Sequence, residues 1–252
     1  HLVHRIIAEA QGLSMRCNRL TGAGDMFKAT SSTVASTVLA ASALVLLPAP
    51  DLKAEVSANI GVVSNYFFRG FSETDGGAAV QGGLDYTADN GFYAGTWASN
   101  VDFGDSTSYE LDLYLGFGQE LDNGLGYDVG YIYYAYPDAP GSADFGEIYG
   151  ELSYSLFAVG AAYTINDSSA SVLETGDLYY YASVGFDLQQ DYSLGLLVGR
   201  SAFDDSTKDN FTHYQASLAK ATEALGEFSF NLEYGNTRND DLKAWVGWSL
   251  GF

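Results

Sequence analysis

The feature that most constrains the fold is a period-two division of side chains, repeated along residues 55–252. In residues 109–118, alternate positions read Tyr, Leu, Leu, Leu, Phe on one side and Glu, Asp, Tyr, Gly, Gly on the other. Successive side chains of a β-strand point to opposite faces, so this segment predicts a strand with one apolar and one polar or small face. Because the division recurs, we predict an all-β chain of about 12 strands, an even number that suits an antiparallel barrel. The expected strands are 56–69, 78–87, 91–101, 108–119, 125–136, 145–155, 156–165, 177–187, 192–201, 210–220, 227–236 and 241–252.

The connections between these strands alternate in length. Those after the even-numbered strands are short, such as 88–90 and 188–191, whereas those after the odd-numbered strands are mostly longer and acidic, such as 166–176. In transmembrane barrels, short turns face the periplasm and longer loops face outside. Every backbone amide within a bilayer must be bonded, which requires the sheet to close. We therefore predict a transmembrane antiparallel up-and-down β-barrel in which strand 56–69 pairs with strand 241–252.

Aromatic side chains end the apolar stripes and predict two girdles at the membrane interfaces. Tyr109 and Phe117 are separated by about 27 Å along a strand, or roughly 21 Å along the membrane normal when the strand is tilted. A soluble sandwich or lipocalin-like barrel would turn its apolar face inward. The simpler alternative is that aromatic residues favour strands in general. The turn-side girdle would hold Phe117, Tyr127, Tyr154, Phe157, Phe186, Tyr192 and Phe252, and the loop-side girdle Tyr109, Tyr133, Tyr163, Tyr214 and Tyr234.

The N-terminal part has the layout of a targeting segment. Residues 26–54 begin Met-Phe-Lys, continue into an apolar run over 34–47 and end on Ala54, which predicts a secretory signal peptide. A membrane-anchor helix would need about 20 apolar residues. Residues 1–25 show no periodicity and are interpreted as a non-native upstream extension, which leaves 55–252 as the barrel. Cys17 falls in this extension, so we expect neither a disulfide nor a lipid anchor in the exported protein.

The charge balance restricts the partners. Residues 55–252 carry 6 basic and 29 acidic side chains, a net charge of −23, which disfavours nucleic acid and anionic headgroups. An exported barrel is nevertheless expected to meet outer-membrane lipid, lipopolysaccharide and the barrel-assembly machinery. The sequence leaves open whether the barrel works alone or as a homo-oligomer.

The polar faces of the strands would line a lumen, and they are mainly acidic. Like charges in a narrow channel with a low-dielectric wall concentrate cations, which predicts a cation-preferring channel. The alternative is a salt-bridged, hydrated plug without transport. Twelve strands lie between barrels that side chains fill and barrels with an aqueous channel, and Tyr114, Tyr134, Tyr149, Tyr179 and Tyr181 would narrow the lumen further. The acidic candidates are Asp85, Glu110, Asp112, Asp128, Glu147, Glu151, Asp187 and Glu233, and the basic candidates are Arg69, Arg200 and Lys243.

Catalytic and metal sites are weakly indicated. His213 is the one histidine after residue 54, and Ser217 on the same predicted strand would be about 13 Å away, too far for a nucleophile and its base. A hydrogen-bonded lumen histidine is therefore favoured, although a serine from a neighbouring strand stays open. Acidic loop residues could bind Ca²⁺ or Mg²⁺ but lack the EF-hand spacing, so we predict no metal and no cofactor. These loop residues are Asp102, Asp105, Asp204, Asp205 and Asp209.

Four segments resemble a known family. Residues 64–86, 91–103, 110–114 and 127–134 are similar to the TorF-like porins, also described as the Gcw_chp conserved hypothetical proteins. The resemblance implies an outer-membrane protein of Gram-negative bacteria, and brings no established substrate or catalytic residue. Together with the lumen it favours passive diffusion of small hydrophilic solutes. The alternatives are a non-conducting structural or adhesion barrel and, with less support, a barrel hydrolase.

The last predicted strand would carry an assembly signal. Trp248, Leu250 and Phe252 would lie on its lipid face with Ala244 and Val246. A terminal aromatic residue in this register resembles the signal by which outer-membrane barrels are recognised for assembly. Deletion of Phe252 is therefore expected to reduce assembly more than the stability of folded barrels.

Overall fold

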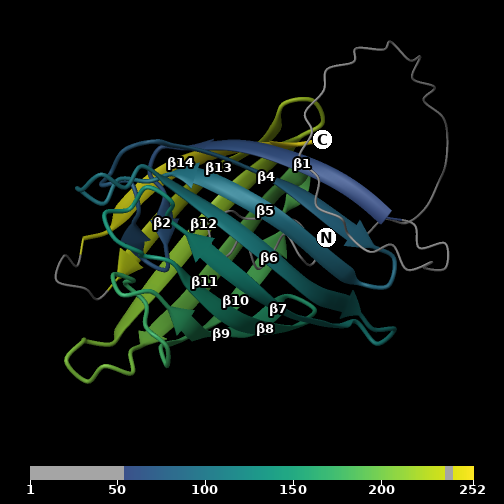
Figure 1. Ribbon diagram of the computed structural model, residues 1–252. Helices are drawn as coiled ribbons and strands as arrows, with labels where there is room; N and C mark the ends of the chain where they lie inside the picture. Colours follow the sequence, from purple (N-terminus) through teal and green to yellow (C-terminus); the bar gives the residue numbers. More distant parts are fainter. Residues whose placement is uncertain (1–53, 236–240) are drawn as a thin grey trace, which may run out of the picture.

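The computed structural model describes residues 54–235 and 241–252, and within them the chain forms one closed antiparallel barrel of twelve strands (Figure 1). This confirms the predicted fold class. The predicted extension and all of the predicted signal peptide except Ala54 lie outside the described residues, and Ala54 begins the first strand. The barrel strands are β1 (Ala54–Val63), β4 (Ala79–Ala88), β5 (Phe92–Asn100), β6 (Tyr109–Glu120), β7 (Leu125–Ala135), β8 (Phe145–Tyr154), β9 (Phe157–Asp167), β10 (Leu178–Asp187), β11 (Tyr192–Ala202), β12 (Phe211–Thr222), β13 (Gly226–Gly235) and β14 (Lys243–Gly251).

The barrel closes between its first and last strands. β1 pairs with β14 in antiparallel register, with Val63 opposite Gly247 and Asn59 opposite Gly251. Beyond the last pair, the amides of Ala58 and Phe252 each donate to the other's carbonyl, at 2.8 and 2.9 Å. The predicted pairing is therefore confirmed, and no edge of this sheet is left open within the described residues.

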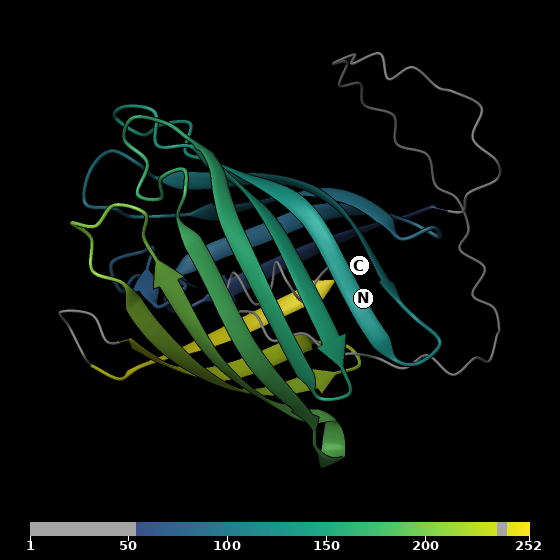
Figure 2. The same ribbon diagram turned by 90° about the horizontal axis from the view of Figure 1, so that it is seen from below.

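The two ends of the barrel differ. The long connections gather at one end, on the left of Figure 1, and the short turns at the other. Figure 2 shows the strongly tilted strands from below. One turn contains the 3-10 helix η1 (Gln189–Asp191). Within the described residues, no helix is long and apolar enough to cross a membrane.

The outer surface carries the apolar faces of the strands. Val56, Phe157 and Val246 are 73%, 63% and 53% exposed, values that a packed core would not allow. Such residues recur on every barrel strand and form a continuous apolar band, as expected of a lipid-facing surface. Large aromatic residues at its edges occupy the positions of the predicted girdles, among them Tyr154 and Phe252 at the turn end and Tyr109 and Tyr214 at the loop end.

The one large departure from the predicted strands is at the first. β1 ends at Val63 rather than at residue 69, whereas the other bounds agree within two residues. Arg69 and Gly70 have φ of +49° and +94° and form a two-residue turn between the short strands β2 (Phe67–Phe68) and β3 (Phe71–Ser72). Positive φ at both central positions is the geometry of the commonest tight hairpin turn. The chain therefore leaves the wall and folds inward as a hairpin over residues 65–74, here called the lumen hairpin.

Candidate functional site in the barrel lumen

The lumen hairpin reaches the barrel wall on several sides through aromatic rings. Ring centroids of Tyr66 and Trp97 on β5 lie 5.6 Å apart, and those of Phe67 and Trp245 on β14 lie 6.3 Å apart. Phe68 meets Tyr134 on β7 at 5.6 Å, and Phe71 meets Phe211 on β12 at 4.5 Å. Most of these rings are buried in one cluster, so an apolar layer lies across the lumen towards the loop end.

Arg69, at the tip of the lumen hairpin, is held by a carboxylate of the wall. Its two terminal nitrogens donate to the two carboxylate oxygens of Glu147 on β8, at 2.8 and 2.7 Å. The guanidinium carbon also lies 4.6 Å from the centre of the Phe68 ring and 4.2 Å from that of Tyr179 on β10. Burial opposes the charged form, but Glu147 more than offsets this and raises the pKa of Arg69 above its ordinary value. The tip is therefore fixed by a bidentate, charge-assisted pair.

The hairpin tip also presses on a second polar cluster. Glu233 on β13 lies 2.7 Å from Nδ1 of His213 on β12, and the Tyr179 hydroxyl lies 2.9 Å from Nε2. The carboxylate and the hydroxyl therefore hold the imidazole ring from its two sides. A Cβ added to Gly70 would lie 2.8 Å from Cβ of His213, so only glycine fits this contact. Both ring nitrogens are thus engaged, and His213 is a hydrogen-bonded lumen residue.

The return arm of the hairpin brings a further carboxylate to the wall. Glu73 faces Glu110 on β6, and burial together with the charge of Glu110 raises the pKa of Glu73 well above its ordinary value. Glu110 also lies beside Asp112, and the two are almost completely buried. On this side the hairpin therefore places a carboxyl group beside other carboxyl groups, whereas at its tip Arg69 is paired with a group of opposite charge.

Nearer the turn end, one wall of the lumen is acidic. It consists of Asp85 on β4, Asp128 on β7 and Glu151 on β8, here called the acidic wall. Asp128 and Glu151 are directly opposite each other on adjacent strands. Each of the two carboxylates accepts a hydrogen bond from a tyrosine hydroxyl, Asp128 from Tyr93 and Glu151 from Tyr181, both at 2.5 Å. Two further short contacts join Tyr114 to Asp85 and Tyr93 to Tyr149.

The lumenal tyrosines lie flat on the wall because glycines face them. A Cβ added to Gly160 would lie 2.5 Å from the ring of Tyr181, and one added to Gly95 would lie 2.5 Å from Tyr114. The same close fit joins Gly116 to Tyr93 and Gly130 to Tyr149. Tyr114, Tyr149 and Tyr181, which were expected to narrow the lumen, therefore lie against its wall. Tyr114 and Tyr181 hold carboxylates there, and Tyr149 is bonded to Tyr93.

The wall facing these carboxylates is made mainly of small or neutral residues. Twelve strands place β7 and β8 across from β13 and β14, where the inward positions include Ser229, Asn231, Gly247 and Ser249, together with the acidic Glu227 opposite Ser249 near the turn end. Acidic side chains are thus more numerous on the side of β4, β7 and β8 than on the side of β13 and β14 at this level of the lumen.

The remaining predicted lumen residues are placed as follows. Asp187 is exposed at the turn-side rim, and Lys243 is opposite Glu233 on the inward face, 5.9 Å from the Phe67 ring. Arg200 is a correction: it shares the outward face of β11 with Leu196 and Val198, and donates to Thr212 at 3.0 Å. The apolar residues of β11 set its register, and this register turns position 200 outward.

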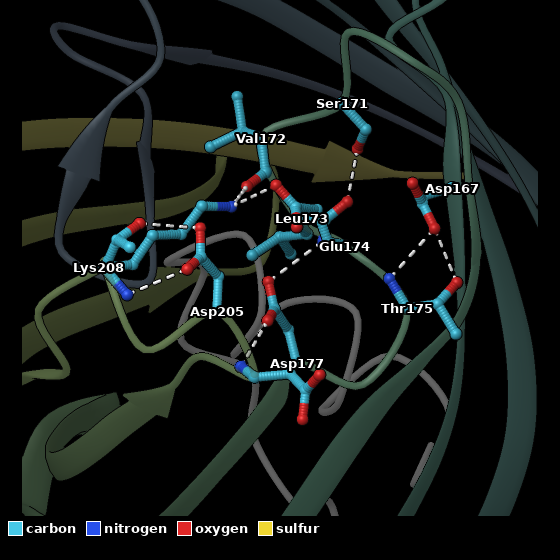
Figure 3. Close-up of polar contacts among 11 residues, drawn as sticks. Asp167, Ser171, Val172, Leu173, Glu174, Thr175, Asp177, Asp205 and Lys208 are labelled. Atoms are coloured by element: carbon cyan, nitrogen blue, oxygen red, sulfur yellow. Dashed lines mark hydrogen bonds and ion pairs between the residues drawn. The ribbon is translucent and has the colours of Figure 1, made fainter.

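At the loop end of the barrel, the loops between β9 and β10 and between β11 and β12 are joined to each other (Figure 3). Lys208 donates to Glu174 at 2.8 Å and to the Val172 carbonyl at 3.1 Å. The Asp205 carboxylate accepts from the amide and hydroxyl of Thr207, which lowers the pKa of Asp205. Among the described residues, no group of three or more His, Cys, Asp or Glu is arranged to hold a metal ion.

The sequence interpretation missed the lumen hairpin and Glu73. A signal was present: Arg69-Gly70 lies between two phenylalanines, and Asp75-Gly76 follows shortly after. A residue followed by glycine between apolar positions indicates a two-residue hairpin turn. The alternation of residues 56–69 suggested one long strand, and for this reason the hairpin turn was not predicted.

The closed barrel, apolar outer band and polar lumen define a transmembrane β-barrel protein. The chain belongs to the family described as "Bacterial protein of unknown function (Gcw_chp)", whose profile matches residues 49–251. No curated protein matches the sequence.

Solved structures with a TM-score of 0.50 or more share the fold at low sequence identity. A chain described as "KdgM porin" is 5% identical, with a TM-score of 0.50 over 79% of this chain and 98% of its own. A chain from "Unveiling the Mechanism Behind the in-meso Crystallization of Membrane Proteins" is 10% identical, with a TM-score of 0.52 over 78% and 83%. Outer membrane phospholipase A from Escherichia coli is 12% identical, with a TM-score of 0.46 over 77% and 91%.

Proposed function

We propose that this protein is an outer-membrane porin that allows passive diffusion of small hydrophilic solutes and prefers cations. The fold likeness to a porin supports a channel, and the resemblance of residues 64–86 to the TorF-like porins points the same way. Export by residues 26–54 and insertion among outer-membrane lipid and lipopolysaccharide by the assembly machinery belong to this proposal.

The acidic wall is the observation that carries the cation preference. Asp85, Asp128 and Glu151 are bonded by tyrosine hydroxyls, and these bonds stabilise the carboxylates in place without supplying positive charge. Across the lumen lie mainly serine, asparagine and glycine, with Glu227 nearer the turn end. A cation moving through would therefore meet fixed negative charge that no basic side chain of the described residues at this level offsets, which lowers its barrier relative to that of an anion.

The test is single-channel recording of the refolded protein in a planar bilayer. We expect discrete conductance steps, and a reversal potential in a salt gradient that shows cation preference. The double variant Asp128→Asn/Glu151→Gln should move the reversal potential towards zero, whereas Asp187→Asn at the exposed rim should have a smaller effect. Anion preference of the unmodified protein would refute the role given to the acidic wall.

A second candidate is a non-conducting structural or adhesion barrel. The lumen hairpin favours it, because its rings and its arginine contact the wall on many sides. Absence of any conductance above the lipid baseline, in the wild type and in variants without the hairpin, would support this candidate. A barrel hydrolase has less support, since the hydroxyl that meets Nε2 of His213 is the phenol of Tyr179 rather than a serine hydroxyl.

A further inference from the structure

We propose that the lumen hairpin is the gate of this channel. The structure holds it in the closed position, and the channel opens when residues 65–74 leave the wall as a unit while the barrel stays intact. The inference rests on the proposed porin function and adds the element that controls it.

The closed position follows from where the hairpin makes contact. Its side chains and backbone meet β5, β7, β8, β10, β12 and β14. In the ring of twelve strands, these contacts are distributed around the whole circumference. A solute entering from the loop end therefore meets a layer of packed rings, in which Tyr66, Phe67, Trp97 and Trp245 are nearly inaccessible.

The mobility follows from how the hairpin is held. β2 and β3 pair with each other in a sheet separate from the barrel. Backbone hydrogen bonds tie the segment to the barrel at its two ends, where Ser64 donates to Val246 at 2.9 Å and the Glu73 carbonyl accepts from Asp102 at 2.8 Å. Between these ends the hairpin contacts the wall through its side chains and through the close approach of Gly70 to His213. It can therefore swing between two fixed points without breaking a barrel strand pair, as hinged loops do.

Two features act as a latch at the tip. One is the bidentate pair of Arg69 with Glu147, and the other is the contact of Gly70 with His213, which tolerates no added carbon. The second feature can be disturbed without changing any charge. Gly70 therefore offers a cleaner test of the gate than Arg69.

The first experiment compares Gly70→Ala with Gly76→Ala in single-channel recordings. Both glycines have positive φ, +94° and +82°, so both substitutions strain the backbone in a similar way. A Cβ at position 70 would meet His213, whereas nothing lies within 4 Å of one at position 76. We expect Gly70→Ala to raise the time-averaged conductance several-fold and Gly76→Ala to leave it at the wild-type level. Heat-modifiable migration on a denaturing gel verifies that both variants are folded.

The second experiment locks the gate. In a Cys17→Ser background, Gly70→Cys/His213→Cys places the two Cβ atoms close enough for a disulfide once the tip shifts by about 1 Å, since disulfide Cβ atoms lie about 3.8 Å apart. Oxidation should abolish the open steps and reduction should restore them in the same protein. The reduced form is its own control for the loss of His213.

The outcomes separate the gate from the channel. If wild type, Gly70→Ala and the oxidised double variant conduct equally, the hairpin is no gate, and the porin function stands. If no variant conducts, including one with residues 65–74 replaced by a short Gly-Ser linker, both the porin function and the gate are refuted. Conductance that rises in Gly70→Ala and falls on oxidation supports the gate.

Discussion

Arg69 and Glu147, 78 positions apart in the sequence, form a buried bidentate ion pair that joins the tip of an inward hairpin to the opposite wall of the barrel. The pair has side-chain exposures of only 7% and 1%. A buried pair of this kind adds little over a matched apolar pair, but loss of one partner leaves the other charge uncompensated. Its main effect is thus to specify one position of the hairpin.

Single and double substitutions at this pair should behave differently. Glu147→Leu leaves Arg69 buried without a counter-charge, a loss of about 3–5 kcal/mol if the hairpin stayed docked. The hairpin can avoid this cost by leaving the wall, so limited proteolysis within residues 65–74 should increase sharply. Arg69→Met/Glu147→Leu should be cleaved more slowly than Glu147→Leu. Equal cleavage of the two variants would mean that the pair does not hold the hairpin.

Acidification should strengthen docking of the hairpin. The docked pKa of Glu73 is raised by burial and by Glu110, so the protonated form favours the docked state. The stabilisation of the docked hairpin by protonated Glu73 is complete below the ordinary pKa of a free glutamate. It is lost as the pH rises through the raised pKa of the docked state. The other groups facing this site are Asp112, Tyr66 and Tyr136. Time-averaged conductance should therefore fall on acidification from neutral pH.

The matched variants for this pH effect are Glu73→Gln and Asp75→Asn. Glu73→Gln keeps the side chain neutral at all pH values and should weaken the response, whereas the exposed Asp75 should contribute little. A pH response unchanged in Glu73→Gln would assign it to other groups.

The fit of tyrosine on glycine should control the width of the lumen. Gly160→Ala places a carbon 2.5 Å from the Tyr181 ring, which must leave the wall and move into the lumen. We expect a smaller unitary conductance and, because the bond from Tyr181 to Glu151 is lost, a stability loss of about 1–3 kcal/mol. Gly195→Ala on β11 is the control, since nothing lies within 4 Å of an added carbon there. Equal unitary conductance of the two variants would show that the rings do not border the solute path.

The aromatic ring of Phe252 should matter for assembly more than for stability. Its backbone bonds to Ala58 remain in Phe252→Ala, and its ring is 75% exposed on the lipid side. We expect less folded protein in cells but an unchanged urea midpoint for the protein that does fold. Phe228→Ala, another outward phenylalanine near the turn end, is the comparison. A parallel loss of yield in both would mean that any lipid-facing ring counts equally.

The barrel could be predicted from the sequence because its outer face is continuous and apolar. Tyr109 to Phe117 repeats one rule at every second position, and lipid enforces that rule on each strand. The lumenal positions follow no such periodic pattern, because their side chains form hydrogen bonds and ion pairs with residues that are far apart in the sequence. The pairing of Arg69 with Glu147 depends on a turn and on strands far apart in sequence. Arg200 was assigned to the wrong face because its charge was given more weight than the alternation, which places position 200 on the apolar face with Leu196 and Val198.

The circumferential contacts of the lumen hairpin have a consequence for the order of folding. The hairpin lies between the first two barrel strands, yet it packs against Trp245 on the last. Its docking site therefore exists only after the whole ring of strands has formed, and contacts of such large sequence separation form late. Until then, its buried arginine and phenylalanines have no place to bind. Docking of the hairpin is thus expected only in a barrel whose twelve strands have all paired.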